Sequence, residues 1–193
     1  SLAGGDMSLW GPDDKAEGWH REVGVGDMDK GHAGLQLLKA IITTVPGVPC
    51  IYQGDEFGVP GANDPDNRDM MRFDGYNDYQ TREYAQTKAL IAERRASMSL
   101  MYGDYRTLYV DDEAWVFLRH YMGDWSVVAM NVRDTEREVI AELPSFVVCA
   151  AAECGECRGF ETAVATEGAT AECLGEGRIS VTVPAYGYVI VNK

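Results

Sequence analysis

The hydrophobic pattern of the chain changes its period near Tyr102, and this change limits the folds that the chain can adopt. Before this position, apolar side chains recur every three to four residues in two stretches, which predicts helices over 31–45 and 79–101. After it, short strand-like runs alternate with turn clusters at a spacing of roughly 8 to 12 residues, as in β-sandwiches. The sequence therefore predicts an α+β protein with one region over 1–102 and an antiparallel β-sandwich over 103–193.

Further elements are predicted on both sides of this boundary. Residues 48–53 form a short apolar run between turn residues, which is typical of a strand buried on both faces. Residues 1–30 are rich in Gly and Asp without a sustained period, and 54–78 is a long polar segment, so both are predicted to be loops. Loops of that length inside a compact domain are usually functional. The strands predicted for the sandwich are 105–108, 114–120, 125–131, 138–142, 160–166, 178–183 and 186–191.

The charge of the chain excludes two classes of partner. The chain has 17 Lys and Arg against 31 Asp and Glu, a formal net charge of −14. Nucleic acids and anionic membrane surfaces both attract proteins through Lys and Arg. The longest apolar run, 35–52, is interrupted by a lysine, two prolines and a glycine, and so lacks the roughly 20 apolar residues of a membrane span. We expect neither a nucleic-acid partner nor a membrane partner.

The most informative segment is 46–73, which reads PGVPCIYQGDEFGVPGANDPDNRDMMRF. It contains the pattern G-x-P-x-I-Y-x-G-x-E-x-G followed by D-P-x-x-R. The matching residues are Gly47, Pro49, Ile51, Tyr52, Gly54, Glu56 and Gly58 for the first pattern, and Asp64, Pro65 and Arg68 for the second. Together these two patterns resemble the end of the catalytic (β/α)8 barrel in glycoside hydrolase family 13, the α-amylase family, where they mark the eighth strand and the loop after it.

The flanking regions are similar to the same family. Residues 1–27 resemble the loop after strand seven, and 89–106 resemble the last barrel helix leading into the C-terminal domain. The β-rich tail resembles the sandwich that closes most members. The resemblance implies an antiparallel β-sandwich like the α-amylase C-terminal domain, preceded by the last helix–strand–helix segment of a TIM barrel.

The resemblance also implies that this chain carries no catalytic residue. Retaining glycosidases need two carboxyl groups about 5 Å apart. In the family these groups lie at the ends of strands four and five, and a third essential Asp lies in an N-H-D motif after strand seven. The 193 residues contain no N-H-D motif and are shorter than a complete barrel, which takes roughly 250 residues. We expect a C-terminal fragment of an α-glucan-active enzyme that is inactive alone.

Two residues are candidate substrate contacts. In some family members the Asp and Arg of D-P-x-x-R donate to or accept from sugar hydroxyls, which makes Asp64 and Arg68 candidate contacts for an α-glucan or maltooligosaccharide in the full-length parent. Arginine offers a rigid fork of donors for such contacts. The alternative is a salt bridge between Asp64 and Arg68 that shapes the loop, and the sequence favours neither.

Three other motif residues are expected to be structural. Glu56 could be taken for a catalytic acid, but its position in the motif favours ordering of the turn through backbone hydrogen bonds. Gly54 belongs to the same turn. Tyr52 is expected to pack in the barrel rather than to stack on a sugar.

The cysteines leave several states open. Cys149, Cys154, Cys157 and Cys173 gather in one stretch, where C-x2-C followed by another Cys is half of a zinc motif. No second C-x2-C and no nearby His completes the motif. Disulfides and free thiols are the other possibilities. No metal and no cofactor are predicted.

Aromatic residues of the sandwich suggest a second class of function. Trp115, Trp125, Tyr121 and Tyr109 could form a platform for sugar rings, although their positions within alternating strands favour core packing. The alternative to an enzyme fragment is therefore a non-catalytic carbohydrate-binding or structural β-sandwich module. In isolation, the strand predicted at 48–53 would expose unpaired edges, so it is predicted either to dock on the sandwich through the two helices or to pair with another copy of the chain.

Overall fold

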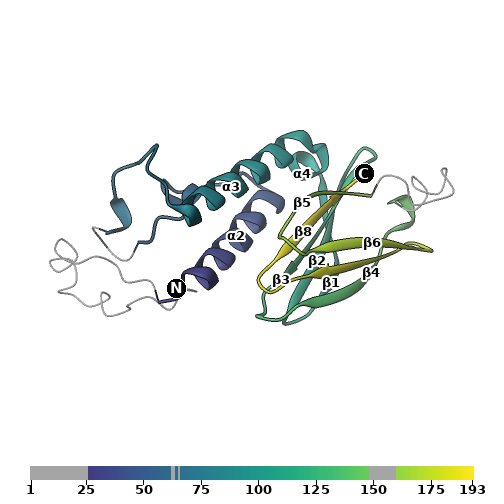
Figure 1. The fold of residues 1–193 in the computed structure, drawn as a ribbon. Coiled ribbons are helices and arrows are strands. Elements are labelled where there is room, and N and C mark those ends of the chain that lie inside the picture. Colours follow the sequence, from purple (N-terminus) through teal and green to yellow (C-terminus); the bar gives the residue numbers. More distant parts are fainter. Residues whose placement is uncertain (1–25, 62–63, 65, 148–159) are drawn as a thin grey trace. The chain divides into compact units, whose positions relative to one another are not determined.

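The computed structural model describes residues 26–61, 64, 66–147 and 160–193 (Figure 1). Their contacts divide the chain into two compact units. The first unit contains, among the described residues, 26–36 and those within 50–88. The second unit contains 37–49 and the described residues from 89 onward. This division differs from the predicted boundary at Tyr102, because the ends of both long helices are counted with the sandwich.

The long helices begin at recognisable capping residues. Helix α2 covers Met28–Thr44, and the Asp27 carboxylate accepts the Lys30 N–H at 2.9 Å, which satisfies a free donor of its first turn. Helix α3 covers Asp78–Ala96, and Asn77 and Gln80 exchange side-chain and backbone hydrogen bonds as a capping box does.

The single helix predicted over 79–101 is divided in two. Ser97 has an extended backbone, and its hydroxyl accepts the Leu100 N–H at 3.1 Å, so it caps a separate short helix, α4, over Met98–Tyr102. A serine that caps a new helix interrupts the hydrogen-bond ladder of the preceding one. Two 3-10 turns, η2 over Asp55–Phe57 and η3 over Asp66–Arg68, lie between α2 and α3.

Residues 48–53 do not form the predicted strand. No described strand pairs with this segment, and Val48 is 95% exposed. A strand requires a hydrogen-bonded neighbour, and an apolar run without one stays irregular. Self-association through this segment remains a prediction.

The second unit contains the antiparallel sheets expected for the α+β class. One sheet has the order β1-β2-β3-β8-β5 and the other the order β4-β7-β6. Strand β6 was not predicted, because its sequence TAECLG combines a Glu and a Gly with few β-formers. The strands cover Asp104–Val110 (β1), Ala114–Tyr121 (β2), Asp124–Asn131 (β3), Arg137–Glu142 (β4), Glu161–Ala165 (β5), Thr170–Gly175 (β6), Arg178–Val183 (β7) and Tyr188–Asn192 (β8).

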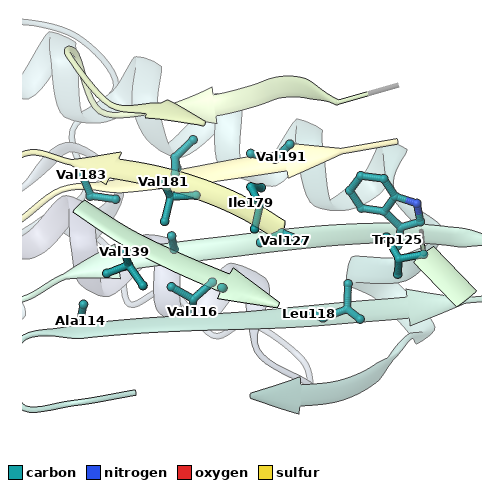
Figure 2. Packing of buried hydrophobic residues seen from close by; sticks show 14 residues of the cluster. Ala114, Val116, Leu118, Trp125, Val127, Val139, Ile179, Val181, Val183 and Val191 are labelled. Carbon is teal, nitrogen blue, oxygen red and sulfur yellow. The ribbon is translucent and has the colours of Figure 1, made fainter. Parts of the chain in front are cut away.

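The main core lies between the two sheets, where alternating side chains of each strand point toward those of the other sheet (Figure 2). Valine dominates this core, since β-branched side chains pack well on a pleated surface. Trp125 is part of it and is 2% exposed, so it cannot serve as a sugar platform. Each fully buried Val or Ile contributes about 2 kcal/mol through the hydrophobic effect.

The other face of the five-stranded sheet is also covered. Phe117, Val128 and Ile190 point away from the main core and pack with helix residues of the same unit, among them Leu90 and Leu100. Strands β2, β3 and β8 are therefore apolar on both faces.

Two buried arginines satisfy the C-terminal carbonyl groups of α2. Arg119, on β2, is 1% exposed and donates through Nη1 to the Thr44 carbonyl oxygen and through Nη2, at 2.9 Å, to that of Gly103. Arg94, on α3, donates to the carbonyl oxygen of Thr43 at 2.7 Å. Burial lowers the pKa of both guanidinium groups below its ordinary value. Helix α2 has no basic residue in its own last turn, so these two side chains provide the positive charge that a helix C-terminus favours.

The structure answers part of the cysteine question. Cys173, on β6, is disulfide-bonded, and Cys50 is a free, exposed thiol. The other three cysteines lie outside the described residues. Within the described ranges, no group of three His, Cys, Asp or Glu side chains could hold a metal ion. None of the helices in this part of the chain is both long and apolar enough to cross a membrane.

Candidate functional site

The motif turn in the first unit is closed by Glu56. The Gly54 N–H donates to Glu56 Oε2 at 2.7 Å, and the Val59 N–H donates to the Gly54 carbonyl oxygen at 3.0 Å. Gly54 and Gly58 flank η2 with φ values of 94° and 74°, which only glycine adopts without strain. The Glu56 carboxylate is thus engaged with the backbone of its own turn, which is the type of contact that a structural role requires.

The motif turn is attached to α3 by one hydroxyl and to the segment just before α3 by one aromatic ring. The Thr87 hydroxyl lies 2.8 Å from the Glu56 carbonyl oxygen and can donate to it. Phe57 is buried and stacks on Tyr76, with ring centroids 4.6 Å apart. Partial burial raises the pKa of Tyr76 above its ordinary value, and the neighbouring Tyr84 and Glu56 raise it further. The turn is therefore held at both its backbone and its apolar side chain.

A buried polar group that the sequence did not reveal lies beside the turn. Glu83 is 1% exposed, its Oε1 accepts from Gln36 Nε2 at 3.0 Å, and it lies 3.1 Å from His32 Nδ1. The His32 ring stacks on Tyr79 at 4.8 Å. A Cβ added at Gly58 would lie 3.0 Å from His32 Cε1, so the turn approaches this histidine closely. In the sequence, polar residues spaced one helical turn apart, such as His32 and Gln36, normally indicate a solvent-exposed helix face. Nothing in this pattern indicates that Glu83 is buried.

The structure brings the two predicted substrate contacts together. Arg68 Nε lies 3.0 Å from Asp64 Oδ1, so the predicted salt bridge forms. The Arg68 side chain is 70% exposed and the Asp64 side chain 25% exposed. The contact uses Nε, and most of the Arg68 side chain stays exposed to solvent. The salt bridge and a ligand contact are therefore compatible. Pro65, between them, lies outside the described residues.

A hollow of about 260 Å³ opens beside the motif turn. Tyr52 and Met70 contribute exposed apolar surface to it, while Gln53, Asn67 and Asp69 contribute hydrogen-bonding groups. Gln53 Nε2 donates to the Asp69 carbonyl oxygen at 3.0 Å, which joins the two sides of the loop. Tyr52 is thus half-exposed at a hollow in this chain, and its packing within a complete barrel stays a prediction. A neutral ligand with both apolar and hydroxyl surfaces matches this lining.

The role of Glu56 in closing the motif turn can be tested directly. Replacing Glu56 by Ala should lower the free energy of unfolding by about 1 kcal/mol, because the Gly54 N–H loses its acceptor. Replacing Glu56 by Gln should cost less, because its side-chain oxygen still accepts. Chemical denaturation of the 193-residue chain measures both values. Equal stability of the two variants would contradict the turn-closing role.

Comparison with known proteins gives consistent results from sequence and structure. No protein-family model matches the chain. The chain is 35% identical over 109 residues to a cyclomaltodextrinase of Thermoanaerobacter pseudethanolicus, a match that covers 56% of this chain and 18% of that protein. It is 36% identical over 97 residues to a cyclomaltodextrin glucanotransferase of Geobacillus stearothermophilus, which covers 50% of this chain and 13% of that protein. The chain therefore spans less than a fifth of the length of these relatives.

Solved structures extend the similarity to the fold. A debranching enzyme from Nostoc punctiforme matches with a TM-score of 0.68 at 26% identity, over 87% of this chain and 32% of that one. An Anoxybacillus α-amylase matches with a TM-score of 0.65 at 23% identity, over 82% of this chain and 31% of that one. The predicted resemblance is thus confirmed: in sequence and in fold, the chain is similar to the C-terminal portion of the α-amylase family, glycoside hydrolase family 13.

Proposed function

We propose that this chain is the C-terminal part of an α-glucan-active enzyme of family 13, that it forms one wall of the glucan-binding cleft, and that it supplies none of the catalytic carboxylates. The observation that carries this proposal is the arrangement of Arg68. Its guanidinium group contacts Asp64 through Nε, and its side chain stays largely exposed, in a loop whose motif resembles the family's strand-eight region. The names of the relatives, cyclomaltodextrinase and cyclomaltodextrin glucanotransferase, support an α-glucan as the ligand.

The role of the loop in this proposal is to bind and orient. Arg68 donates hydrogen bonds to sugar hydroxyls, and Asp64 fixes the guanidinium plane so that less side-chain entropy is lost on binding. The nearby hollow offers Tyr52 and Met70 to the apolar faces of sugar rings. Glu56 stays engaged in its turn and takes no proton from the substrate. Bond cleavage requires two carboxyl groups about 5 Å apart, and these come from outside this chain.

The binding role predicts a specific loss of affinity. Arg68→Ala should weaken binding of maltoheptaose about tenfold in calorimetry, because at least one charge-assisted donor is removed. Asp64→Asn should weaken it less, because the amide can still contact Arg68. Arg95→Ala, which removes an exposed arginine of α3, is the matched control and should bind like the parent chain. Equal affinity of the Arg68→Ala and Arg95→Ala proteins would exclude Arg68 as a contact.

The catalytic part of the proposal has its own assay. The purified 193-residue chain should release no reducing sugar from maltooligosaccharides or cyclodextrins above the buffer background. Measurable hydrolysis that persists through purification and is lost on denaturation would contradict the proposed absence of catalytic carboxylates.

A further inference from the structure

We propose a second saccharide-binding site in the sandwich, separate from the loop of the first unit. It consists of Tyr102, Tyr105, Trp115 and Tyr121, which we call the aromatic strip. The strip lies along the β1 edge of the five-stranded sheet, in the second unit. The inference goes beyond the proposed function, and only the choice of an α-glucan as ligand rests on it.

The strand register places Tyr105, Trp115 and Tyr121 on one face of the sheet. Successive residues of a strand point to opposite faces, so Trp115, Phe117, Arg119 and Tyr121 of β2 share the face that points away from the main core. Tyr105, on β1, is the register partner of Arg119 and points to the same face. Of the four aromatics that the sequence suggested as a platform, Trp115 and Tyr121 thus lie on this face.

The two remaining aromatics from the sequence lie elsewhere. Trp125 belongs to the main core and Tyr109 packs against it. The Tyr109 hydroxyl also donates to Asp111 Oδ2 at 2.5 Å, a contact that lowers the pKa of Asp111 well below its ordinary value. Trp125 is buried and Tyr109 is half-buried, whereas Tyr102 and Tyr105, which the sequence did not indicate, are exposed.

Tyr105 and Trp115 form a pre-organised pair. Their ring centroids are 6.2 Å apart with an interplanar angle of 56°, and Trp115 Nε1 donates to the Tyr105 hydroxyl at 3.0 Å. The same hydroxyl lies 2.8 Å from Thr107 Oγ1. Both rings also pack on buried Phe117, which restricts their rotation. Side chains held in this way lose little entropy when a ligand binds.

A second pair continues the strip. Tyr102, at the end of α4, and Tyr121, at the end of β2, have centroids 5.8 Å apart and an interplanar angle of 48°. Tyr102 is 62% exposed and Tyr105 39% exposed, so both rings are accessible. Six residues separate Trp115 from Tyr121 along β2, which corresponds to about 20 Å. Phe117 and Arg119, which lie between them on the same face, are buried, so the two pairs form two separate contact points that a chain of several sugar units could reach together.

The chemistry of the strip favours a neutral ligand. The negative face of an aromatic ring attracts the C–H groups of a sugar, and the Tyr105 and Thr107 hydroxyls can exchange hydrogen bonds with sugar hydroxyls. Among the described residues, Arg and Lys side chains lie over the rings of Phe57, Tyr79 and Tyr84, and none is recorded over a ring of the strip. The net charge of −14 also disfavours an anionic ligand.

The first experiment detects ligand binding at the aromatic strip in the unsubstituted chain. In an NMR titration with maltoheptaose, the indole N–H resonance of Trp115, assigned through the Trp115→Phe variant, should shift in a saturable way. The indole resonance of buried Trp125 is the internal control and should stay in place. Sorbitol at the same mass concentration should shift neither signal. An unchanged Trp115 resonance at millimolar maltoheptaose would overturn the proposal.

The second experiment separates this site from the loop. Tyr102→Ala and Tyr105→Ala should each weaken the maltoheptaose-dependent shift of Trp115 at least fivefold, while Arg68→Ala leaves it unchanged. Tyr84→Ala, which removes an exposed tyrosine of α3 in the first unit, is the matched control. Because Tyr105 also covers Phe117, Tyr102→Ala is the decisive variant if Tyr105→Ala unfolds. Loss of the shift in Arg68→Ala with no effect of Tyr102→Ala would overturn the strip and leave the proposed function standing.

Discussion

Replacing Arg119 by Met should lower the free energy of unfolding by about 3 kcal/mol, one of the largest effects expected for a single substitution in this chain. Arg119 donates to the carbonyl oxygens of Thr44 and Gly103, both in the interior of the second unit. Met fills a similar volume but donates nothing, so two buried acceptors lose their partner, at about 1–3 kcal/mol each. Relief of the desolvated charge, and of its repulsion by Arg94, offsets part of this loss.

Guanidinium chloride denaturation followed by circular dichroism measures this change. Arg106→Met is the matched control, because Arg106 is an exposed arginine on the adjacent strand β1, and its loss should change stability by less than about 0.5 kcal/mol. Arg119→Lys keeps the charge but loses the fork of donors, so it should fall between Met and the parent. If Arg119→Met is as stable as Arg106→Met, the carbonyl contacts do not stabilise the fold.

Replacing Gly103 by Ala should cost about 3 kcal/mol for a different reason, which is crowding. A Cβ at this position would overlap the Ser99 carbonyl oxygen and lie 2.9 Å from backbone atoms of His120. These neighbours belong to α4 and β2 and cannot rotate away as a side chain would. Gly103 has a φ of −68°, which alanine adopts easily, so the cost arises from contact and not from backbone strain.

A substitution at a second glycine distinguishes the cost of a crowded Cβ from the cost of a strained backbone. Gly123, in the turn between β2 and β3, has a φ of 90° and open space around its missing Cβ. Gly123→Ala should therefore cost only about 1 kcal/mol, from the left-handed backbone. Thermal unfolding of both variants should show the larger fall in Tm for Gly103→Ala. The reverse order would show that α4 can move away from β2 at little cost.

Local patterns predicted the helices and most strands because their cause is local. The apolar period that indicated the helices acts within a few residues of the chain, whereas the caps Asp27 and Asn77 fell in segments predicted to be loops. The strand predicted over 48–53 does not form because pairing depends on a neighbour that no local pattern supplies. The break between α3 and α4 depends on Ser97, whose hydroxyl could equally have faced solvent within a longer helix. Sequence thus fails where a partner distant in the chain decides the outcome.

The candidate site shows the same limit. The motif anticipated the turn at Gly54 and Glu56, because its glycines and carboxylate act over two residues. The pairing of His32 with Glu83 spans two helices, and charged residues at helical spacing normally indicate solvent exposure. The sequence also did not predict the burial of Arg94 and Arg119, since a lone arginine in a strand or helix is far more often exposed than buried.

The arginine contacts at the end of α2 also affect the order in which the chain can fold. The bond from Arg94 to Thr43 joins residues 51 positions apart, and the bond from Arg119 to Thr44 joins residues 75 positions apart. Closing loops of this length is slow and costs entropy before any contact forms. The last turn of α2 is therefore completed only when β2 is in place. Its amide groups should exchange with solvent at the rate set by global unfolding of the sandwich, whereas a free helix end would fray on its own.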